Sequence, residues 1–286
     1  MKRLRNWLLF VLIVVIWGSN WIVMKSGLRV TGPLNFVMHR FLFALLALSP
    51  ALVYSPKMIP RDRDTWRRLL VLSLINSASI LSTNIGLVYE KSGISAVLTY
   101  TQPLFVFCLA VPFLKEKPSI ARLMGVLMGF VGVLVLYLEG VLSSTLLSQP
   151  LAFLLLGAFF WAVTIVYYKK ALSHVGPVVT NVVQFAVGVI ILSTLALMFE
   201  GFHFIMTGTY VLIVLYMSVF ASAIALTLWV LLLKEEEATV VSASSFVIPM
   251  VALVFGWLFL GEVIELQSIL GLALILSGVY LVNRKT

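Results

Sequence analysis

The stretch that decides the fold is residues 8–26, LLFVLIVVIWGSNWIVMKS, which is apolar for most of its length and carries one charge, Lys25, near its end. A helix needs about 20 mostly apolar residues to cross a bilayer. Nine later runs have the same character. We therefore predict ten membrane-spanning helices, at residues 8–26, 34–54, 69–88, 93–114, 120–138, 150–168, 177–199, 209–232, 238–260 and 266–282.

The composition agrees with a chain surrounded by lipid. Of its 286 residues, 62% are hydrophobic and 11% are charged, whereas a soluble domain carries about 25% charged residues. The net charge of +9 comes from residues in short loops between apolar runs, not from one clustered basic face. We predict an all-α membrane protein with the lipid bilayer as a partner and no nucleic acid.

The distribution of Lys and Arg predicts the orientation of the chain. Sixteen of the 20 fall in segments on the side of the N-terminus, three fall on the opposite side, and Arg40 lies within a span. Cytoplasmic loops carry the excess of positive charge. We predict a multi-pass protein of a bacterial-type inner membrane, with both termini cytoplasmic.

The two halves of the sequence repeat. Residues Trp17, Lys25, Leu28, Gly32 and Pro33 recur 144 positions later as Trp161, Lys169, Leu172, Gly176 and Pro177. Residues Pro103, Glu116, Gly125 and Gly132 recur 146 positions later as Pro249, Glu262, Gly271 and Gly278. Each half holds five spans, so the second must be inverted relative to the first. We predict one five-helix repeat at residues 1–142 and an inverted one at 143–286, an arrangement typical of secondary transporters with a substrate site between the repeats.

The repeated residues resemble the drug/metabolite transporter (DMT) superfamily, specifically its ten-span EamA family. The resemblance covers essentially the whole chain. It rests on Ile16-Trp17-Gly18-Ser19-Asn20-Trp21, Pro33 with Arg40, Pro103 with Lys115-Glu116 and Gly125, and Pro249 with Gly261-Glu262, Gly271 and Gly278. It implies a central cavity lined by the first four helices of each half, with the fifth and tenth helices peripheral. Members of this family resemble exporters of amino acids and related metabolites.

The acidic residues restrict the chemistry of the site. All 11 fall in loops or at helix ends. The small four-span multidrug members of the superfamily use a first-helix carboxylate for cations and protons, and residues 8–26 contain none. This departure argues against a lipophilic cation as substrate. We find no enzymatic motif and no room for a nucleotide-binding domain, so we predict a non-enzyme without cofactor or metal site, driven by gradients.

One charge is predicted to lie inside the membrane. Arg40 lies about 10 Å along the second span from its outer end, where a charge costs about 2.5–3.5 kcal/mol or more. Either Arg40 or Lys25 contacts a substrate carboxylate, which guanidinium binds in a two-pronged way, or Arg40 bonds to backbone carbonyls or an outer-loop carboxylate and locks helices together.

Polar and aromatic side chains recur at helical spacing in several spans. Because polar groups facing lipid would lack hydrogen-bond partners, these stripes are predicted to face inward. They line either a substrate cavity or a dry helix interface in which Ser and Thr act as small packing residues. The candidate substrate-binding residues are Trp17, Asn20, Trp21, Arg40, Asn76, Thr83, Thr99, Gln102, Trp161, Gln184 and Ser245.

Prolines and glycines mark special positions in the spans. Pro103 and Pro249 each interrupt a helix at corresponding places, which predicts a hinge or a static kink. Gly125, Gly129 and Gly132 form one small-residue face, and Gly271 and Gly278 form another. These faces predict close helix packing, with a homodimer contact as the alternative.

We therefore predict a secondary transporter that exports small metabolites, such as amino acids or organic acids, by alternating access. Two alternatives remain. One is a multidrug or aromatic-compound exporter of the same fold, suggested by the tryptophans. The other is a non-transporting membrane scaffold, which would leave the inverted repeat and the polar stripes unexplained.

Overall fold

A computed structural model describes residues 2–54, 58–117, 119–138, 149–203, 205, 207–260 and 266–284, and these residues form helices and no strand. The first half contains α1 (Lys2–Gly18), α2 (Asn20–Leu28), α3 (Pro33–Leu48), α4 (Pro50–Val53), α5 (Arg63–Tyr89), α6 (Ser92–Thr99), α7 (Gln102–Leu114) and α8 (Ile120–Leu136). The second half contains α10 (Gln149–Ala171), α11 (Pro177–Phe199), α12 (Gly208–Leu215), the π-helix η2 (Tyr216–Ile224), α13 (Ala225–Glu235), α14 (Ala238–Ser244), α15 (Val247–Leu260) and α16 (Leu266–Asn283).

The predicted spans are confirmed. Nine helical stretches among the described residues are long and apolar enough to cross a bilayer, and α8, with 17 residues, is a shorter apolar helix. The largest boundary differences are at α1, which begins at Lys2 instead of residue 8, and at α5, which begins at Arg63 instead of residue 69. At α5 the reason is a local cap: the Thr65 amide donates to the Asp62 carboxylate at 2.7 Å. This hydrogen bond lowers the pKa of Asp62 below its usual value.

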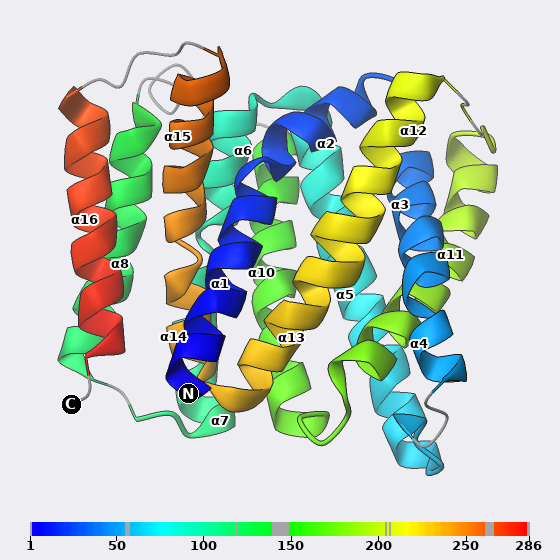
Figure 1. Cartoon of the computed structure of the whole chain (residues 1–286), viewed down its shortest axis with the longest axis horizontal. Helices are drawn as coiled ribbons and strands as arrows, with labels where there is room; N and C mark the ends of the chain where they lie inside the picture. The colour runs from blue at the N-terminus through cyan, green and yellow to red at the C-terminus, as the bar shows by residue number, and fades with distance from the viewer. Residues whose placement is uncertain are drawn as a thin grey trace.

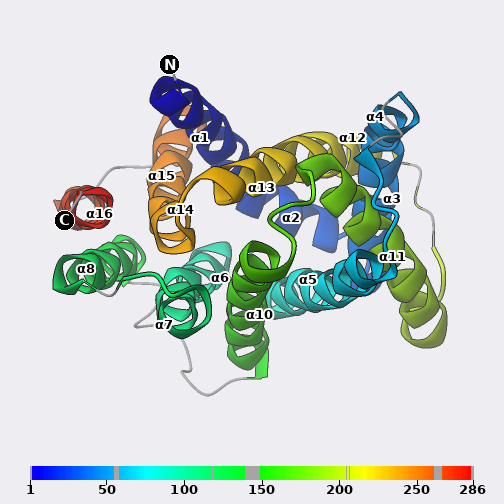
Figure 2. The same ribbon diagram turned by 90° about the horizontal axis from the view of Figure 1, so that it is seen from below.

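The helices stand side by side, with both marked chain ends at the same end of the bundle (Figure 1). Seen from below, α8 and α16 form one edge of the molecule, apart from α1, α5, α10 and α13 (Figure 2). The fifth and tenth spans are therefore peripheral, as the family resemblance implied.

Paired helix breaks occur at the two predicted prolines. The fourth span divides into α6 and α7 at Tyr100–Thr101, just before Pro103. The ninth span divides into α14 and α15 at Ser245–Phe246, just before Pro249. Both prolines lie in the first turn of the second piece, where a missing amide proton costs no helical hydrogen bond.

Three further irregularities were not predicted. The first span breaks at Ser19, the second breaks at Ser49 before Pro50, and the eighth passes through the π-helix η2. Ser19 at the first break contacts the Tyr216 hydroxyl of η2 at 2.5 Å. Short π-helical segments are rare and occur often at functional sites.

The glycine faces of the fifth and tenth spans pack against each other within the chain. A Cβ on Gly125 would lie 2.6 Å from the carbonyl oxygen of Gly278, and one on Gly132 would lie 2.8 Å from that of Gly271. Close helix packing is therefore confirmed. The alternative, a homodimer contact through these faces, stays a prediction, and in this structure α8 and α16 cover each other's glycines.

Two equivalent lysines show the inversion of the repeat. Lys25 donates from Nζ to the carbonyl oxygens of Leu87, Val88 and Glu90, at 2.5, 2.9 and 2.8 Å, at the end of α5. Lys169 donates to the carbonyl oxygens of Leu233, at 2.7 Å, and Glu236, at the end of α13. Each lysine ends the first span of its half and caps the third, and the two caps lie at opposite ends of the bundle (Figure 1). Glu262, the repeat partner of Glu116, lies outside the described residues.

Candidate functional site

A central cavity of about 130 Å³ lies between the two halves. The first four spans of the first half and the sixth, eighth and ninth spans supply its walls. The lining residues are Trp17, Asn20, Trp21, Met24, Arg40, Ser79, Ile80, Thr83, Asn84, Thr99, Tyr100, Gln102, Gly157, Trp161, Leu226, Trp229, Ser245 and Ile248.

Nine of the eleven residues predicted from sequence line this cavity: Trp17, Asn20, Trp21, Arg40, Thr83, Thr99, Gln102, Trp161 and Ser245. The other two, Asn76 and Gln184, line a neighbouring cavity of about 20 Å³. Trp161, Leu226 and Trp229 line both spaces. The predicted residues therefore fall into two groups. Nine line the central cavity, and Asn76 and Gln184 line the smaller cavity, which shares Trp161 and Trp229 with the central one.

Three tryptophans from different spans meet at the wall between the two cavities. The ring centroids of Trp17 and Trp229 lie 5.2 Å apart, those of Trp17 and Trp161 lie 6.2 Å apart, and those of Trp161 and Trp229 lie 6.4 Å apart. Trp17 is fixed further by its indole Nε1, which donates to the carbonyl oxygen of Ala221 in η2 at 3.1 Å. These three residues, the tryptophan cluster, present large apolar surface with a fixed orientation.

Arg40 is buried at the cavity and has a neutral partner. Its side chain, on α3, is 6% exposed, and its Nε donates to Ser222 Oγ on η2 at 2.6 Å. No ion pair of Arg40 occurs among the described residues. The predicted alternative partners, backbone carbonyls or an outer-loop carboxylate, are wrong because a hydroxyl takes their place. Lys25 caps α5, so the interpretation of Lys25 as a substrate contact is also wrong.

Gln102 joins the two broken helices. Its Nε2 donates to Ser245 Oγ at 3.0 Å, and its Oε1 accepts from Ser242 Oγ at 3.1 Å. Gln102 begins α7, and Ser245 stands between α14 and α15, so the fourth and ninth spans contact each other where both are interrupted. Both helix breaks thus lie at the wall of the cavity.

Four buried polar atoms at the cavity have no hydrogen-bond partner among the described residues. They are Asn20 Oδ1, Asn84 Oδ1, Thr99 Oγ1 and Trp229 Nε1. Buried polar groups are normally paired. Together with the terminal nitrogens of Arg40, they offer both donors and acceptors to a ligand or to water.

In the part of the chain that the structure describes, the cavity wall contains a cation and no carboxylate. Among the described residues, the acidic side chains lie at or beyond helix ends, and no group of three His, Cys, Asp or Glu side chains is placed to hold a metal. The charge at this site is therefore positive, which favours a ligand with a negative group.

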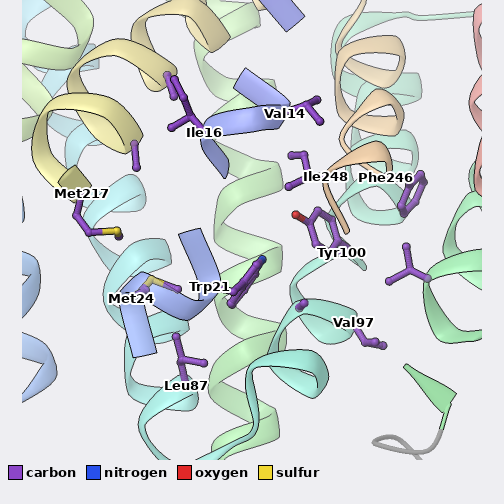
Figure 3. Packing of buried hydrophobic residues seen from close by; sticks show 14 of the residues in the cluster. Val14, Ile16, Trp21, Met24, Leu87, Val97, Tyr100, Met217, Phe246 and Ile248 are labelled. Carbon is purple, nitrogen blue, oxygen red and sulfur yellow. The ribbon is translucent and has the colours of Figure 1, made fainter. Parts of the chain in front are cut away.

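Some lining residues were not in the predicted set. Met24, Ser79, Asn84 and Trp229 lie on polar or aromatic stripes that are visible in the sequence. Tyr100, Gly157, Leu226 and Ile248 carry no such signal, because their positions depend on the breaks and on close helix contact. Figure 3 shows Trp21 between Met24 and Tyr100, with Ile248 next to Tyr100. The ring centroids of Trp21 and Tyr100 are 6.4 Å apart.

Known proteins resemble this chain over its full length. The model of the EamA-like transporter family matches twice, at residues 5–138 and 149–284. The uncharacterized transporter YvbV of Bacillus subtilis strain 168 is 30% identical over 290 residues, which cover 100% of this chain and 94% of that protein. A probable amino-acid metabolite efflux pump of Salmonella typhimurium is 27% identical, with coverage of 96% and 93%.

A solved crystal structure shares the fold, with a TM-score of 0.80 at 16% identity, covering 98% of this chain and 96% of that chain. The two family matches divide the chain as its internal repeat does, and spans from both halves line the central cavity. This chain belongs to the EamA-like transporter family and is a multi-pass membrane protein of that family.

Proposed function

We propose that this protein is a secondary transporter that exports small metabolites bearing a carboxylate, such as amino acids or organic acids. One observation carries the proposal: Arg40 stands in the central cavity with its Nε bound to a neutral hydroxyl and without a carboxylate partner among the described residues. A buried guanidinium binds a carboxylate through two parallel hydrogen bonds. The substrate would supply the negative charge that the protein does not.

The size of the cavity supports a small substrate. Pockets for drug-sized ligands measure roughly 300–1,000 Å³, and this cavity measures about 130 Å³. Its four unpaired polar atoms suit a compact polar molecule better than an apolar one. The Salmonella relative named as a probable amino-acid metabolite efflux pump supports the same substrate class.

Alternating access would use the two repeats, residues 1–142 and 143–286, as the moving units. Pro103 and Pro249 are the proposed hinges, since each lies in the first turn after a helix break at the cavity wall. The loop charges support an orientation with both termini cytoplasmic in the inner membrane. An exporter in this orientation would take up its substrate at the end of the bundle that carries the termini and release it at the opposite end.

The tryptophan cluster favours a second candidate, an exporter of aromatic compounds. Its rings bind flat aromatic molecules and also attract cations through their π faces. The two candidates differ in what they require of Arg40. A carboxylate substrate needs the guanidinium, whereas an aromatic cation would be repelled by it.

Efflux from loaded vesicles tests both candidates. The purified protein is reconstituted into vesicles loaded in turn with labelled amino acids, organic acids and aromatic cations, and the loss of label is compared with protein-free vesicles. We expect efflux of at least one carboxylate-bearing compound, strongly reduced by Arg40→Gln. Efflux of aromatic cations alone would replace the first candidate by the second. No efflux across the panel would favour the scaffold.

A further inference from the structure

A second hollow lies at the end of the bundle that carries both marked chain ends, away from the substrate cavity. It has a volume of about 1080 Å³ and is formed where α7 and α10 end and where α8 and α14 begin. Figure 2 shows α7, α8 and α10 from this end. Five basic side chains line it: Lys115, Lys117, Arg122, Lys169 and Lys170.

The two carboxylates in this hollow are already engaged. Glu116 accepts hydrogen bonds from the backbone amides of Ala238, at 2.6 Å, and Thr239, at 3.2 Å, and so caps α14. Glu237 forms an ion pair with Arg122 at 2.5 Å. The formal charge of the lining is therefore an excess of three positive charges.

Three of the basic side chains have no acidic partner. Lys115, Lys117 and Lys170 are exposed, and no ion pair of theirs occurs among the described residues. In addition, Nε of Arg122 is buried and finds no hydrogen-bond partner in the described part of the chain. The hollow thus presents several donors for an anion, and the described part of the chain supplies no carboxylate to Lys115, Lys117 or Lys170.

Two exposed apolar side chains lie at this hollow: Phe113 lines it, and Ile120 follows the lining residue Ser119. Phe113, the residue before the last of α7, is 50% exposed, and Ile120, the first residue of α8, is 83% exposed. Lys170 lies over the Phe113 ring, 5.1 Å from its centroid. A phospholipid has a charged headgroup and apolar acyl chains. The basic side chains of the hollow suit the headgroup, and the neighbouring apolar side chains suit the acyl chains.

Cytoplasmic loops generally carry an excess of positive charge, which explains why basic residues occur at this end of the bundle. It does not explain why five of them line one hollow. On the same end of the bundle, Arg61, Arg63 and Arg67 lie exposed at the start of α5 and do not line this hollow. We infer that the hollow between α7, α8, α10 and α14 binds the phosphate-bearing headgroup of an anionic phospholipid, with Lys115, Lys117 and Lys170 as its principal contacts.

The experiment compares the full-length protein in nanodiscs of phosphatidylcholine alone and of phosphatidylcholine containing a minority of phosphatidylglycerol. A ligand that binds the folded state raises the apparent melting temperature. We expect phosphatidylglycerol to raise it by several degrees in the unaltered protein. The triple variant Lys115→Gln, Lys117→Gln, Lys170→Gln should lose most of this rise.

The matched control removes the same charge from the same end: Arg61→Gln, Arg63→Gln, Arg67→Gln. It should keep the full rise. If the first triple variant does not fold, the single variants Lys117→Gln and Lys170→Gln should each reduce the rise. A further arm adds inorganic phosphate, at matched ionic strength, to nanodiscs of phosphatidylcholine alone.

Three results would overturn the inference. The first is no difference between the two lipid compositions in the unaltered protein. The second is an equal loss of the rise in both triple variants, which would show that only the overall surface charge matters. The third is a full rise from inorganic phosphate, which would make the site one for a soluble phosphate and not for a lipid.

Discussion

Arg40 is held by Ser222: the Arg40 Nε donates to Ser222 Oγ at 2.6 Å, and that hydroxyl donates in turn to the carbonyl oxygen of Met217 at 2.8 Å. The second span is thereby tied to the π-helix of the eighth. A guanidinium has five N–H donors, of which this contact uses one. No described residue bonds either terminal nitrogen, so both can make an end-on contact with a carboxylate.

The first prediction concerns this guanidinium. Arg40→Gln should lower the efflux of a carboxylate-bearing substrate roughly 10- to 100-fold, because a hydrogen bond to a charged group is worth about 1.5–3 kcal/mol. Arg40→Lys should recover only part of the loss, since an ammonium lacks the planar fork. Initial efflux rates from vesicles measure both variants. Arg29→Gln, at an exposed position on α2's C-cap, should change nothing, and an equal loss there would refute the role of Arg40.

The second prediction concerns the lysine caps. Lys25→Met removes three hydrogen bonds to the end of α5 and leaves partly buried carbonyl oxygens without this donor. Leaving one such carbonyl oxygen without a partner should lower the free energy of unfolding by about 1–3 kcal/mol. The variant should therefore melt at a lower temperature in detergent. Lys169→Met should behave alike, because it caps α13 in the same way. Lys91→Met, at an exposed position, is the control, and equal melting temperatures in all three variants would contradict the capping role.

Sequence reasoning located the spans, the breaks at Pro103 and Pro249 and most of the cavity wall, because these depend on local apolar length, on repeated motifs and on helical periodicity. It missed Ser222 as the partner of Arg40. Those two residues are 182 positions apart, and their meeting depends on the register of helix packing, which no local pattern carries. It also assigned Lys25 to the substrate as one alternative. From sequence, a lysine at the end of a span looks the same whether it meets a ligand or a helix end.

The third prediction concerns the glycine contact of α8 with α16. Gly125→Ala and Gly132→Ala would each place a Cβ within 2.8 Å of a backbone oxygen, which cannot move without shifting the helix. Overpacking of this kind costs about 1–3 kcal/mol, so both variants should melt at lower temperature. Gly176→Ala and Gly208→Ala are matched controls, because a Cβ at either position meets nothing within 4 Å. Unchanged stability in the first pair would show that α8 and α16 pack less closely.

The last prediction concerns the turn between α13 and α14. Its three consecutive glutamates, Glu235 to Glu237, each bond a side chain of the first half. Arg5 bonds Glu235 at 2.5 Å, Asn6 bonds Glu236 at 2.9 Å, and Arg122 bonds Glu237 at 2.5 Å. Contacts made in one conformation bias the equilibrium towards it. Breaking them should raise the population of the state that is open at this end.

Cysteine labelling measures this shift. In a Cys108→Ser background, which removes the single native cysteine, Thr99→Cys places a thiol on the wall of the central cavity. Adding Arg122→Gln and Glu237→Gln should speed its reaction with a membrane-impermeant maleimide applied from the end that carries the termini. The control, Arg68→Gln with Asp64→Asn, removes an ion pair at the same end, within α5, and should leave the rate unchanged. If both pairs accelerate labelling equally, the effect belongs to surface charge; if only the first pair does, the Glu235–Glu237 turn acts as a closure of this end of the pathway.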